Sequence, residues 1–255
     1  MSRPAGTAGS SRLKLIVAYD GAAFAGWQSQ AHGGAVQDHL EKAFQEITNK
    51  PTRVHGAGRT DAGVHALGQC AHADVPKNRL TLAQWTAALN ANLPPTLRVL
   101  SCRATRESFH ARFSAKGKVY RYRIWNGPVL PPLENGRAWH IARPLDLRLL
   151  QAAAQRFAGR HDFAAFAANR GQSETDTRRT IRSVKVRRNG PLVTIELEGD
   201  GFLYKMARMM VAAAVQCGQG KTKVSELSAR LAAGRCARGS LVAPAAGLFL
   251  IRVRY

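Results

Sequence analysis

The chain has 255 residues, with 38 Lys and Arg against 16 Asp and Glu, so its formal net charge at pH 7 is +22. The positive charge is spread along the whole chain, which favours a folded surface that binds phosphate groups; a basic surface that is only solvated is the alternative. No apolar run approaches the ~20 residues that a membrane-spanning helix needs, so an integral membrane protein is excluded.

The cysteines do not suggest a metal site or a disulfide framework, because they are scattered and form no Cys-x-x-Cys pair. They are Cys70, Cys102, Cys217 and Cys236. We therefore expect a cytoplasmic protein with reduced thiols.

The first half of the chain alternates between strand and helix patterns. Residues 1–11 are small and polar, and we expect a disordered N-terminal segment that lacks the apolar core of a secretory signal. A short organellar presequence stays open because the segment has no acidic residue. The following patterns predict a strand at 13–19, an amphipathic helix at Val36–Thr48, an extended stretch at 53–55, a strand at 69–75, a helix capped by Thr81 and a strand at 97–104.

The second half shows similar patterns together with a hairpin signal. They predict a strand at 119–125, a helix capped by Asp146, strands at 181–187 and 193–197 around the turn Asn189-Gly190, a helix at 202–216 stopped by Gly218, a shorter helix ending at Gly234 and a strand at 249–253. Hairpins mixed with helices favour an α+β protein with a largely antiparallel sheet over a doubly wound parallel one.

One acidic residue stands out in this basic chain. Asp61 lies in the loop 58–66, whose sequence is Gly-Arg-Thr-Asp-Ala-Gly-Val-His-Ala. Arg59 favours the ionised carboxylate, which suits a nucleophile or a base at neutral pH. On spacing alone, an aspartate that only caps a turn beside an arginine is equally consistent. A glycoside-type reaction would normally need a second carboxylate, and only this one stands out.

A metal site is a further alternative for the same region. His55, His65, His72 and Asp74 lie close together in the sequence. Their spacings match no standard ligand pattern, so we expect no metal.

Aromatic and basic residues alternate in the strand at 119–125. Tyr120 and Tyr122 lie on one side of this strand, and Arg121 and Arg123 lie on the other. Such interleaving is typical of a nucleic-acid surface, where cations hold phosphates and rings stack on bases. Because a buried strand gives the same pattern, we expect at least one of the two tyrosines to be in the core.

Arg208 is a single cation in the apolar helix around residues 206–211. A buried arginine is unfavourable unless it is paired. It could pair with any acidic residue for structural reasons, and Asp61 is the more specific candidate.

Taken together, these motifs resemble the tRNA pseudouridine synthase A (TruA) family. The resemblance covers nearly everything from Leu13 to Tyr255 in family order. It rests on Tyr19-Asp20-Gly21, Gly26-Trp27-Gln28, the loop 58–66, Phe109-His110-Ala111-Arg112-Phe113-Ser114, Tyr120-Arg121-Tyr122, Arg160-His161-Asp162-Phe163, Gly201-Phe202-Leu203 through Arg208, Ala243-Pro244 and Gly247-Leu248.

The resemblance implies an isomerase that converts uridine to pseudouridine at positions 38 to 40, in the anticodon stem-loop of tRNA, without a metal or any other cofactor. It implies that Asp61 is the catalytic aspartate, Tyr120 stacks on the target uracil, Arg208 pairs with Asp61, and Leu248 lies beneath the base. Arg59 is expected to hold the stem-loop open for the flipped nucleotide. Further expected tRNA contacts are His65 and Arg112, which lie in the matching motifs.

The resemblance also implies a fold and an assembly. We expect two pseudo-symmetric, ferredoxin-like α+β halves that share a central antiparallel sheet, with helices packed on one side and the active cleft between the halves. The N-terminal half, 12–108, would carry the Asp61 loop, and the C-terminal half, 109–255, would carry Tyr120 and Arg208. The protein is expected to be a homodimer in the cytoplasm and not to bind membranes.

Two other classes of protein remain as rivals. A non-catalytic RNA-binding or chaperone protein would need the basic surface and the aromatic residues but not Asp61. A metal-dependent hydrolase would use His55, His65 and Asp61.

Overall fold

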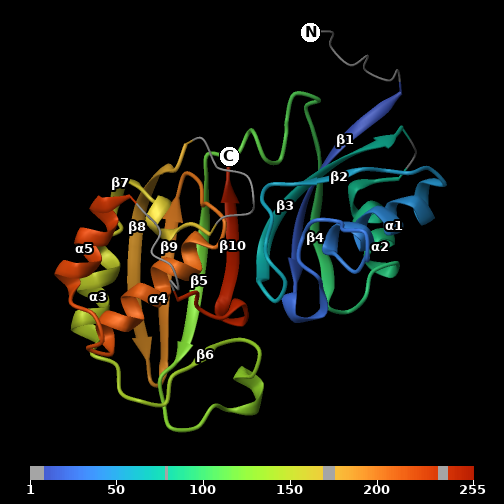
Figure 1. Cartoon of the computed structure of the whole chain (residues 1–255). Coiled ribbons are helices and arrows are strands. Elements are labelled where there is room, and N and C mark those ends of the chain that lie inside the picture. Colours follow the sequence, from blue (N-terminus) through green and yellow to red (C-terminus); the bar gives the residue numbers. More distant parts are fainter. Residues whose placement is uncertain (1–8, 78–79, 169–175, 235–240) are drawn as a thin grey trace. The chain divides into compact units, whose positions relative to one another are not determined.

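The computed structural model describes residues 9–77, 80–168, 176–234 and 241–255. Residues 1–8 of the segment expected to be disordered lie outside the described residues, and so does Cys236. The chain forms two compact units, one that runs to Ala115 and also holds Tyr255, and one at Lys116–Arg254. Each unit combines helices with a largely antiparallel sheet, which confirms the predicted α+β class (Figure 1). The expected division near residue 109 and the shared cleft stay predictions.

The first unit has the predicted order strand, helix, strand, strand, helix, strand. Its elements are β1 (Ser10–Tyr19), α1 (Val36–Thr48), β2 (Val54–Gly56), β3 (His65–Pro76), α2 (Leu82–Ala91) and β4 (Leu97–Thr105). Strands β4, β1 and β3 lie side by side in that order, and β2 pairs with β3; all these pairings are antiparallel. Ser10 and Ser11 belong to β1, although the sequence suggests disorder there.

Both helices of the first unit begin at side-chain caps. At the start of α1, the Asp38 carboxylate accepts a hydrogen bond from the backbone N–H of Ala35 (2.9 Å). At the start of α2, Thr81 and Gln84 cap each other reciprocally. The apolar stripe of α1 is buried, which confirms the helix that its periodicity predicts; it consists of Val36, Leu40, Ala43 and Phe44.

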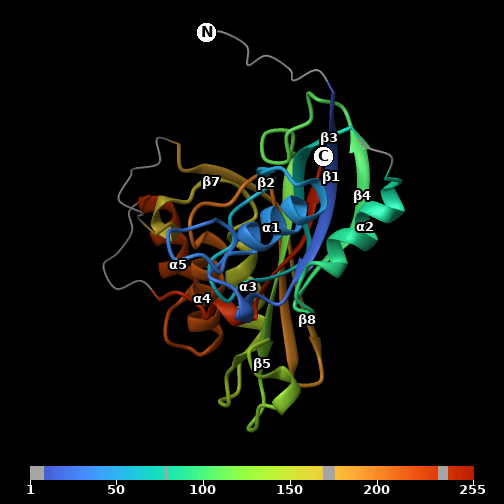
Figure 2. The ribbon, with the colours of Figure 1, turned by 90° about the vertical axis from the view of Figure 1, so that its right-hand side faces the viewer.

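The second unit is a sheet with helices on one side. Its elements are β5 (Gly117–Trp125), β6 (Trp139–His140), α3 (Leu147–Gln155), β7 (Gly159–Asp162), β8 (Arg178–Asn189), β9 (Leu192–Gly199), α4 (Met206–Gly218), α5 (Val224–Ala233) and β10 (Leu248–Arg254). The strand order is β10-β5-β9-β8-β7, and β6 pairs with β5 in parallel. In Figure 2 the three helices of this unit lie on one side of its strands.

Short 3-10 turns complete the two units. They are η1 (Gly21–Ala23), η2 (Pro132–Glu134), η3 (Ala164–Phe166) and η4 (Ala245–Gly247). No helix within the described ranges is long and apolar enough to cross a bilayer.

Two sequence predictions in the second unit are wrong in detail. The helix predicted at 202–216 begins only at Met206, because Lys205 adopts a left-handed backbone conformation (φ 58°), and it continues through Gly218 to a cap at Gln219. In the hairpin, Asn189 pairs with Leu192, so the turn residues are Gly190 and Pro191. Gly190 has φ 56°, a value that suits glycine.

Candidate active site

The loop that carries Asp61 joins β2 to β3, and its course is fixed by backbone hydrogen bonds. Trp27 N donates to Thr60 O (3.0 Å), Gly63 N donates to Gly21 O (3.2 Å), and Val64 N donates to Asp61 O (3.1 Å). Two of these bonds come from the segment that follows β1. These peptide hydrogen bonds, on both sides of the half-buried Asp61, fix the course of the loop backbone.

Two buried side chains outside the loop also form hydrogen bonds with it. The hydroxyl groups of Tyr19 and Thr60 are 2.8 Å apart. The fully buried Gln69 donates from Nε2 to Gly58 O (2.8 Å). Burial raises the pKa of Tyr19 to about 12, so its hydroxyl stays neutral at physiological pH. We did not predict the supporting role of Tyr19 and Gln69, because they contact the loop only after the chain folds.

Two glycines are required by the close approach of the segment 20–27 to the loop. A Cβ atom on Gly21 would lie 2.1 Å from Val64 O. A Cβ atom on Gly26, whose φ is +96°, would lie 2.8 Å from Thr60 O. These distances leave no room for a side chain at either position.

Gly26→Ala is expected to lower the free energy of unfolding by about 1–3 kcal/mol, because the new Cβ atom adds a clash with Thr60 O to an unfavourable backbone conformation. Urea unfolding measures the change. The matched control is Gly33→Ala, because Gly33 also has a positive φ (+67°) but no atom within 4 Å of a new Cβ atom. Equal destabilisation by the two changes would show that the contact with Thr60 is unimportant.

Arg59 is exposed, and its Nε donates to Gln28 Oε1 (3.0 Å). This bond ties the arginine to the Gly26-Trp27-Gln28 segment. The bond was not predicted, since Arg59 and Gln28 are 31 residues apart in the sequence.

His65 is buried, with 3% of its surface exposed. Its Nδ1 accepts a hydrogen bond from Gly21 N (3.1 Å) and lies 3.1 Å from Asp20 Oδ1. This geometry gives His65 a supporting contact with the segment that follows β1, and the tRNA contact expected from the sequence stays a prediction.

Arg112 is exposed in the loop that follows β4. Its guanidinium carbon lies 5.6 Å from the centroid of the Phe113 ring, and Phe113 is 76% exposed. A cation beside an exposed ring is the combination that a nucleic-acid surface uses.

Three histidines of the first unit have their rings close together. The rings of His55, His72 and His110 lie with centroids 4.6–5.6 Å apart. Burial, with the nearby charges of His110, Arg12 and His55, lowers the pKa of His72 to about 4. The described residues contain no group of three or more His, Cys, Asp or Glu that could hold a metal ion. The hydrolase alternative therefore gains no support from this part of the chain.

In the second unit, both tyrosines of β5 are buried, and Tyr122 is the more deeply buried of the two. It is fully buried, and its hydroxyl donates to Pro244 O (2.7 Å). Burial raises the pKa of this hydroxyl far above its usual range. The opposite face of β5 is polar, as predicted: Arg121 pairs with Glu196 (2.8 Å) and Arg123 with Glu134 (2.5 Å).

Tyr120 is 7% exposed, and its ring packs edge-on against Phe202 with centroids 4.9 Å apart. Leu250 lies opposite Tyr120 in the β10–β5 pairing, and Leu248 lies opposite Tyr122. The predicted uracil-binding residues Tyr120 and Leu248 are therefore on adjacent strands of one sheet.

Arg208 has a structural partner in its own unit. Its Nε donates to Ala243 O (2.7 Å), and its backbone carbonyl accepts from Ala243 N (3.3 Å). Ala243 precedes η4 and Leu248, so α4 holds the segment that leads into β10. Asp61 belongs to the other unit, and the pairing of Asp61 with Arg208 stays a prediction.

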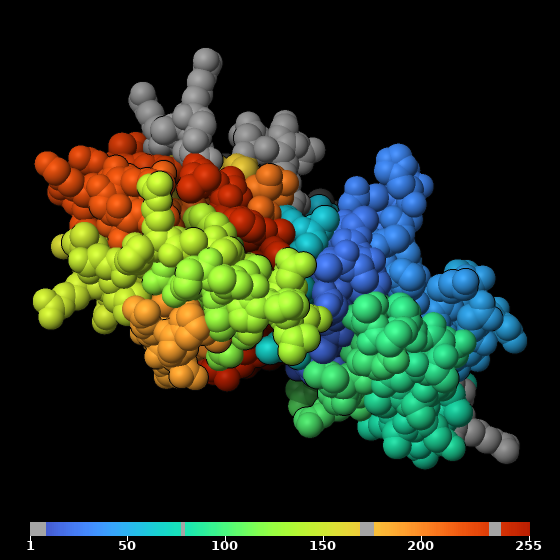
Figure 3. All heavy atoms as spheres, turned by 90° about the horizontal axis from the view of Figure 1, so that it is seen from below, coloured from blue at the N-terminus to red at the C-terminus, as the bar shows by residue number. Residues whose placement is uncertain are grey.

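A basic hollow of about 280 Å³ lies on the face of the second sheet that carries Arg121. It is lined by Arg121, Lys185, Arg187, Arg188, Asn189, Leu192, Thr194 and Glu196. Four of these residues are cations and one is a carboxylate. The β8–β9 hairpin, in orange, lies at the surface in Figure 3. Such a hollow can accept anionic groups.

Comparisons with known proteins agree with these motifs. Residues 15–114 and 153–255 match the model of a family described as tRNA pseudouridine synthase. The chain is 45% identical over 252 residues to the tRNA pseudouridine synthase A of Akkermansia muciniphila, covering 96% of this chain and 95% of the relative. The enzyme of the same name from Solidesulfovibrio magneticus is 45% identical over 96% of this chain and 91% of its own. The tRNA pseudouridine synthase A of a Bradyrhizobium strain is 43% identical, and the match covers 96% of this chain and 99% of that protein.

Proposed function

The chain belongs to the tRNA pseudouridine synthase family, and on this basis we propose that it converts uridine to pseudouridine in the anticodon stem-loop of tRNA, at positions 38 to 40. The catalytic group is the Asp61 carboxylate, acting as a nucleophile or a base. The observation that supports this most directly is the loop of Asp61, which is held by backbone bonds from the Gly21 and Trp27 peptides and presents a half-buried acid in a strongly basic chain.

The isomerisation balances without an oxidant or a reductant. The bond between ribose C1′ and uracil N1 breaks, the base rotates, and C1′ bonds to C5. The proton on C5 is lost, and N1 gains one. Asp61 either bonds to C1′ or removes a proton from the ribose, and both roles need the ionised carboxylate.

The second unit supplies the surroundings of the base in this proposal. Tyr120 stacks on the uracil, and Leu248 lies beneath it. Arg208 pairs with Asp61; a guanidinium has five N–H donors, so its bond to Ala243 O is compatible with a carboxylate partner. Through the same bond, Arg208 also fixes the segment that leads to Leu248.

The positive charge provides the affinity for tRNA. Extruding a base from a stem costs a few kcal/mol, which phosphate contacts and stacking can offset. Arg59 and Arg112 extend this binding surface around the first unit. We also propose that the enzyme acts in the cytoplasm as a homodimer whose two subunits both contact the tRNA.

The test is to incubate an unmodified tRNA transcript with the purified protein and to map pseudouridine in the product. We expect it at one or more of positions 38 to 40. Pseudouridine at other positions only would keep the enzyme class but refute the anticodon stem-loop as its target. A tRNA that stays unmodified would refute the proposed function.

The basic hollow makes a separate prediction about binding. The double variant Lys185→Ala/Arg187→Ala is expected to bind tRNA more weakly. The plot of the logarithm of the association constant against the logarithm of the salt concentration should also become less steep, by about 1 to 2 in slope, because up to two phosphate contacts are lost. Titrations at several salt concentrations measure both effects. The control removes two exposed cations elsewhere in the same unit, Lys221 and Lys223. Equal effects of the two double variants on tRNA affinity would mean that the net charge of the protein, and not the basic hollow, determines the affinity.

A further inference from the structure

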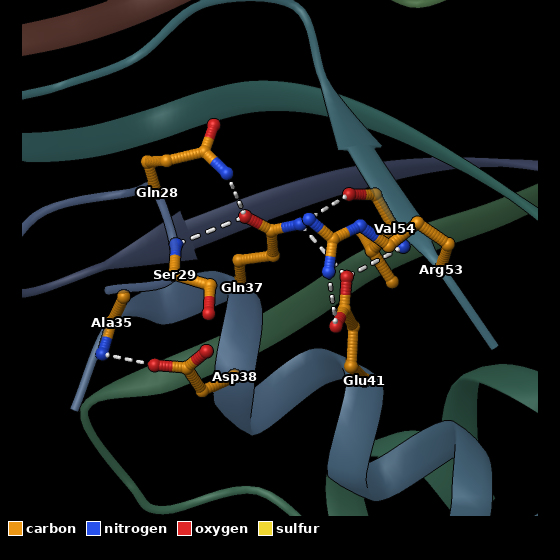
Figure 4. Close-up of polar contacts among 8 residues, drawn as sticks. All are labelled: Gln28, Ser29, Ala35, Gln37, Asp38, Glu41, Arg53 and Val54. Atoms are coloured by element: carbon orange, nitrogen blue, oxygen red, sulfur yellow. Dashed lines mark hydrogen bonds and ion pairs between the residues drawn. The ribbon is translucent and has the colours of Figure 1, made fainter. Parts of the chain in front are cut away.

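A buried glutamine lies at the centre of a polar network in the first unit (Figure 4). Gln37, in the first turn of α1, is 3% exposed. Its Nε2 donates to Glu41 Oε1 (2.8 Å) and to Val54 O (3.1 Å). Its Oε1 accepts from Gln28 Nε2 (2.8 Å) and from Ser29 N (3.0 Å). All the donors and acceptors of this amide group are therefore used.

The partners of Gln37 determine which way its amide group points. The Val54 carbonyl and the Glu41 carboxylate can only accept, and the Ser29 N–H can only donate. The amide nitrogen must therefore face Glu41, and the oxygen must face Ser29. Because Gln37 directs its amide oxygen towards Gln28, Gln28 must direct its amide nitrogen towards Gln37 and donate the hydrogen bond. This leaves Gln28 Oε1 directed to the other side of the Gln28 amide.

Gln28 Oε1 is the atom that accepts from Arg59 Nε (3.0 Å). The chain of side chains Glu41–Gln37–Gln28–Arg59 thus presents an acceptor, and not a donor, to the guanidinium. Reversing the Gln28 amide would set an N–H group against a cation that can only donate. The network therefore holds the exposed Arg59 in one orientation, two residues before Asp61.

The network is anchored in regular structure. Glu41 Oε1 also accepts from the backbone N–H of Val54 (3.0 Å), and Glu41 Oε2 accepts from Arg53 (3.3 Å). Glu41 and Gln37 lie one turn apart on α1, and Val54 is the first residue of β2. The orientation of Arg59 is thus set by a helix and a strand rather than by the loop alone.

We propose that Gln28 and Gln37 are positioning residues that preorganise Arg59 for contact with the RNA backbone. The proposal rests on the proposed function, in which Arg59 belongs to the tRNA-binding surface. A long exposed cation loses rotamer freedom when it binds, and a side chain that is already ordered loses less. We expect the preorganisation to improve tRNA affinity roughly 2- to 10-fold, which is the range for one immobilised side chain.

The test is a double-mutant cycle on tRNA affinity. Gln28→Met is expected to raise the dissociation constant of tRNA roughly 2- to 10-fold in the wild-type background, and to change it little in an Arg59→Ala background. Gln37→Met, which removes the buried amide, is expected to behave in the same way. Additive effects of Gln28→Met and Arg59→Ala would overturn the proposal, because they would show that Gln28 acts independently of Arg59.

Two further variants keep the result interpretable. Gln30→Met is the matched control, because Gln30 lies in the same segment but its side-chain Nε2 donates to the backbone carbonyl of Ala25 (3.2 Å) and not to Gln28 or Gln37. An affinity loss equal to that of Gln28→Met would overturn the proposal. If Gln28→Met fails to fold, Gln28→Asn replaces it, since the shorter amide cannot reach both Gln37 and Arg59.

Measuring tRNA affinity and pseudouridine formation separately distinguishes a failure of this proposal from a failure of the proposed function. Wild-type protein that binds tRNA but forms no pseudouridine would refute the proposed function, and the affinity cycle would still test the network. Pseudouridine formation by the wild type with additive effects in the cycle would refute the network alone.

Discussion

Asp61→Asn is expected to abolish pseudouridine formation while leaving tRNA binding largely intact. Asparagine has nearly the shape of aspartate, but it carries no charge and is neither a base nor a useful nucleophile. Loss of a general base alone lowers a rate by about 10²- to 10⁴-fold, and loss of a nucleophile removes the covalent route altogether. Single-turnover conversion of a tRNA transcript measures the reaction, and a binding titration measures the affinity.

The folded loop should survive this substitution, which makes the prediction clear to interpret. Backbone hydrogen bonds at the Asp61 carbonyl, the Thr60 carbonyl and the Gly63 N–H hold the loop, and the substitution leaves these three groups in place. A matched neutralisation is Asp38→Asn at the start of α1, where an asparagine oxygen can still accept from Ala35 N. We expect Asp38→Asn to retain activity. Undiminished activity of Asp61→Asn would refute the catalytic role.

The same experiment separates an enzyme from a non-catalytic RNA-binding protein. A chaperone or a binding module would bind tRNA through its basic surface and form no product with any variant. If Asp61→Asn lost binding and activity together, Asp61 would be a residue that shapes the RNA-binding surface rather than the reactive group.

The fold could be predicted where local patterns decide the structure. Helix α1 has the predicted bounds because its apolar residues recur at helical spacing and Asn49, in a left-handed conformation, ends it. The start of α4 was misplaced because a left-handed backbone at Lys205 has no signature in the sequence. The hairpin turn moved by one residue because the pairing of Asn189 with Leu192 decides the register.

The candidate site was predicted only in part. The acid in its glycine-rich loop is visible in the sequence, but the residues that hold it are not. Tyr19 and Thr60 are 41 residues apart, and Gln28 and Arg59 are 31 apart, so their hydrogen bonds depend on how β1, α1 and β3 assemble. The burial of the His65 ring against Gly21 also depends on this assembly, and its place in a sequence motif gave no sign of it.

Tyr120→Leu is expected to lower the rate of pseudouridine formation about 5- to 150-fold, whereas Tyr120→Phe keeps most of it. Stacking of one base on an aromatic ring is worth about 1–3 kcal/mol, and a leucine fills space without providing a flat ring. Phenylalanine keeps the ring and also the edge-on contact with Phe202. Single-turnover rates at saturating enzyme, with a common tRNA transcript, measure the difference.

Stability must be measured alongside, because Tyr120 is 7% exposed and any substitution there changes packing. Phe202→Leu provides the matched control: it removes the other ring of the pair and disturbs the same packing without touching Tyr120. If stacking on the uracil is the function of Tyr120, Tyr120→Leu should lose more activity than Phe202→Leu at equal loss of unfolding free energy. Equal rates for Tyr120→Leu and Tyr120→Phe would place the ring away from the base and leave Tyr120 as a core residue like Tyr122.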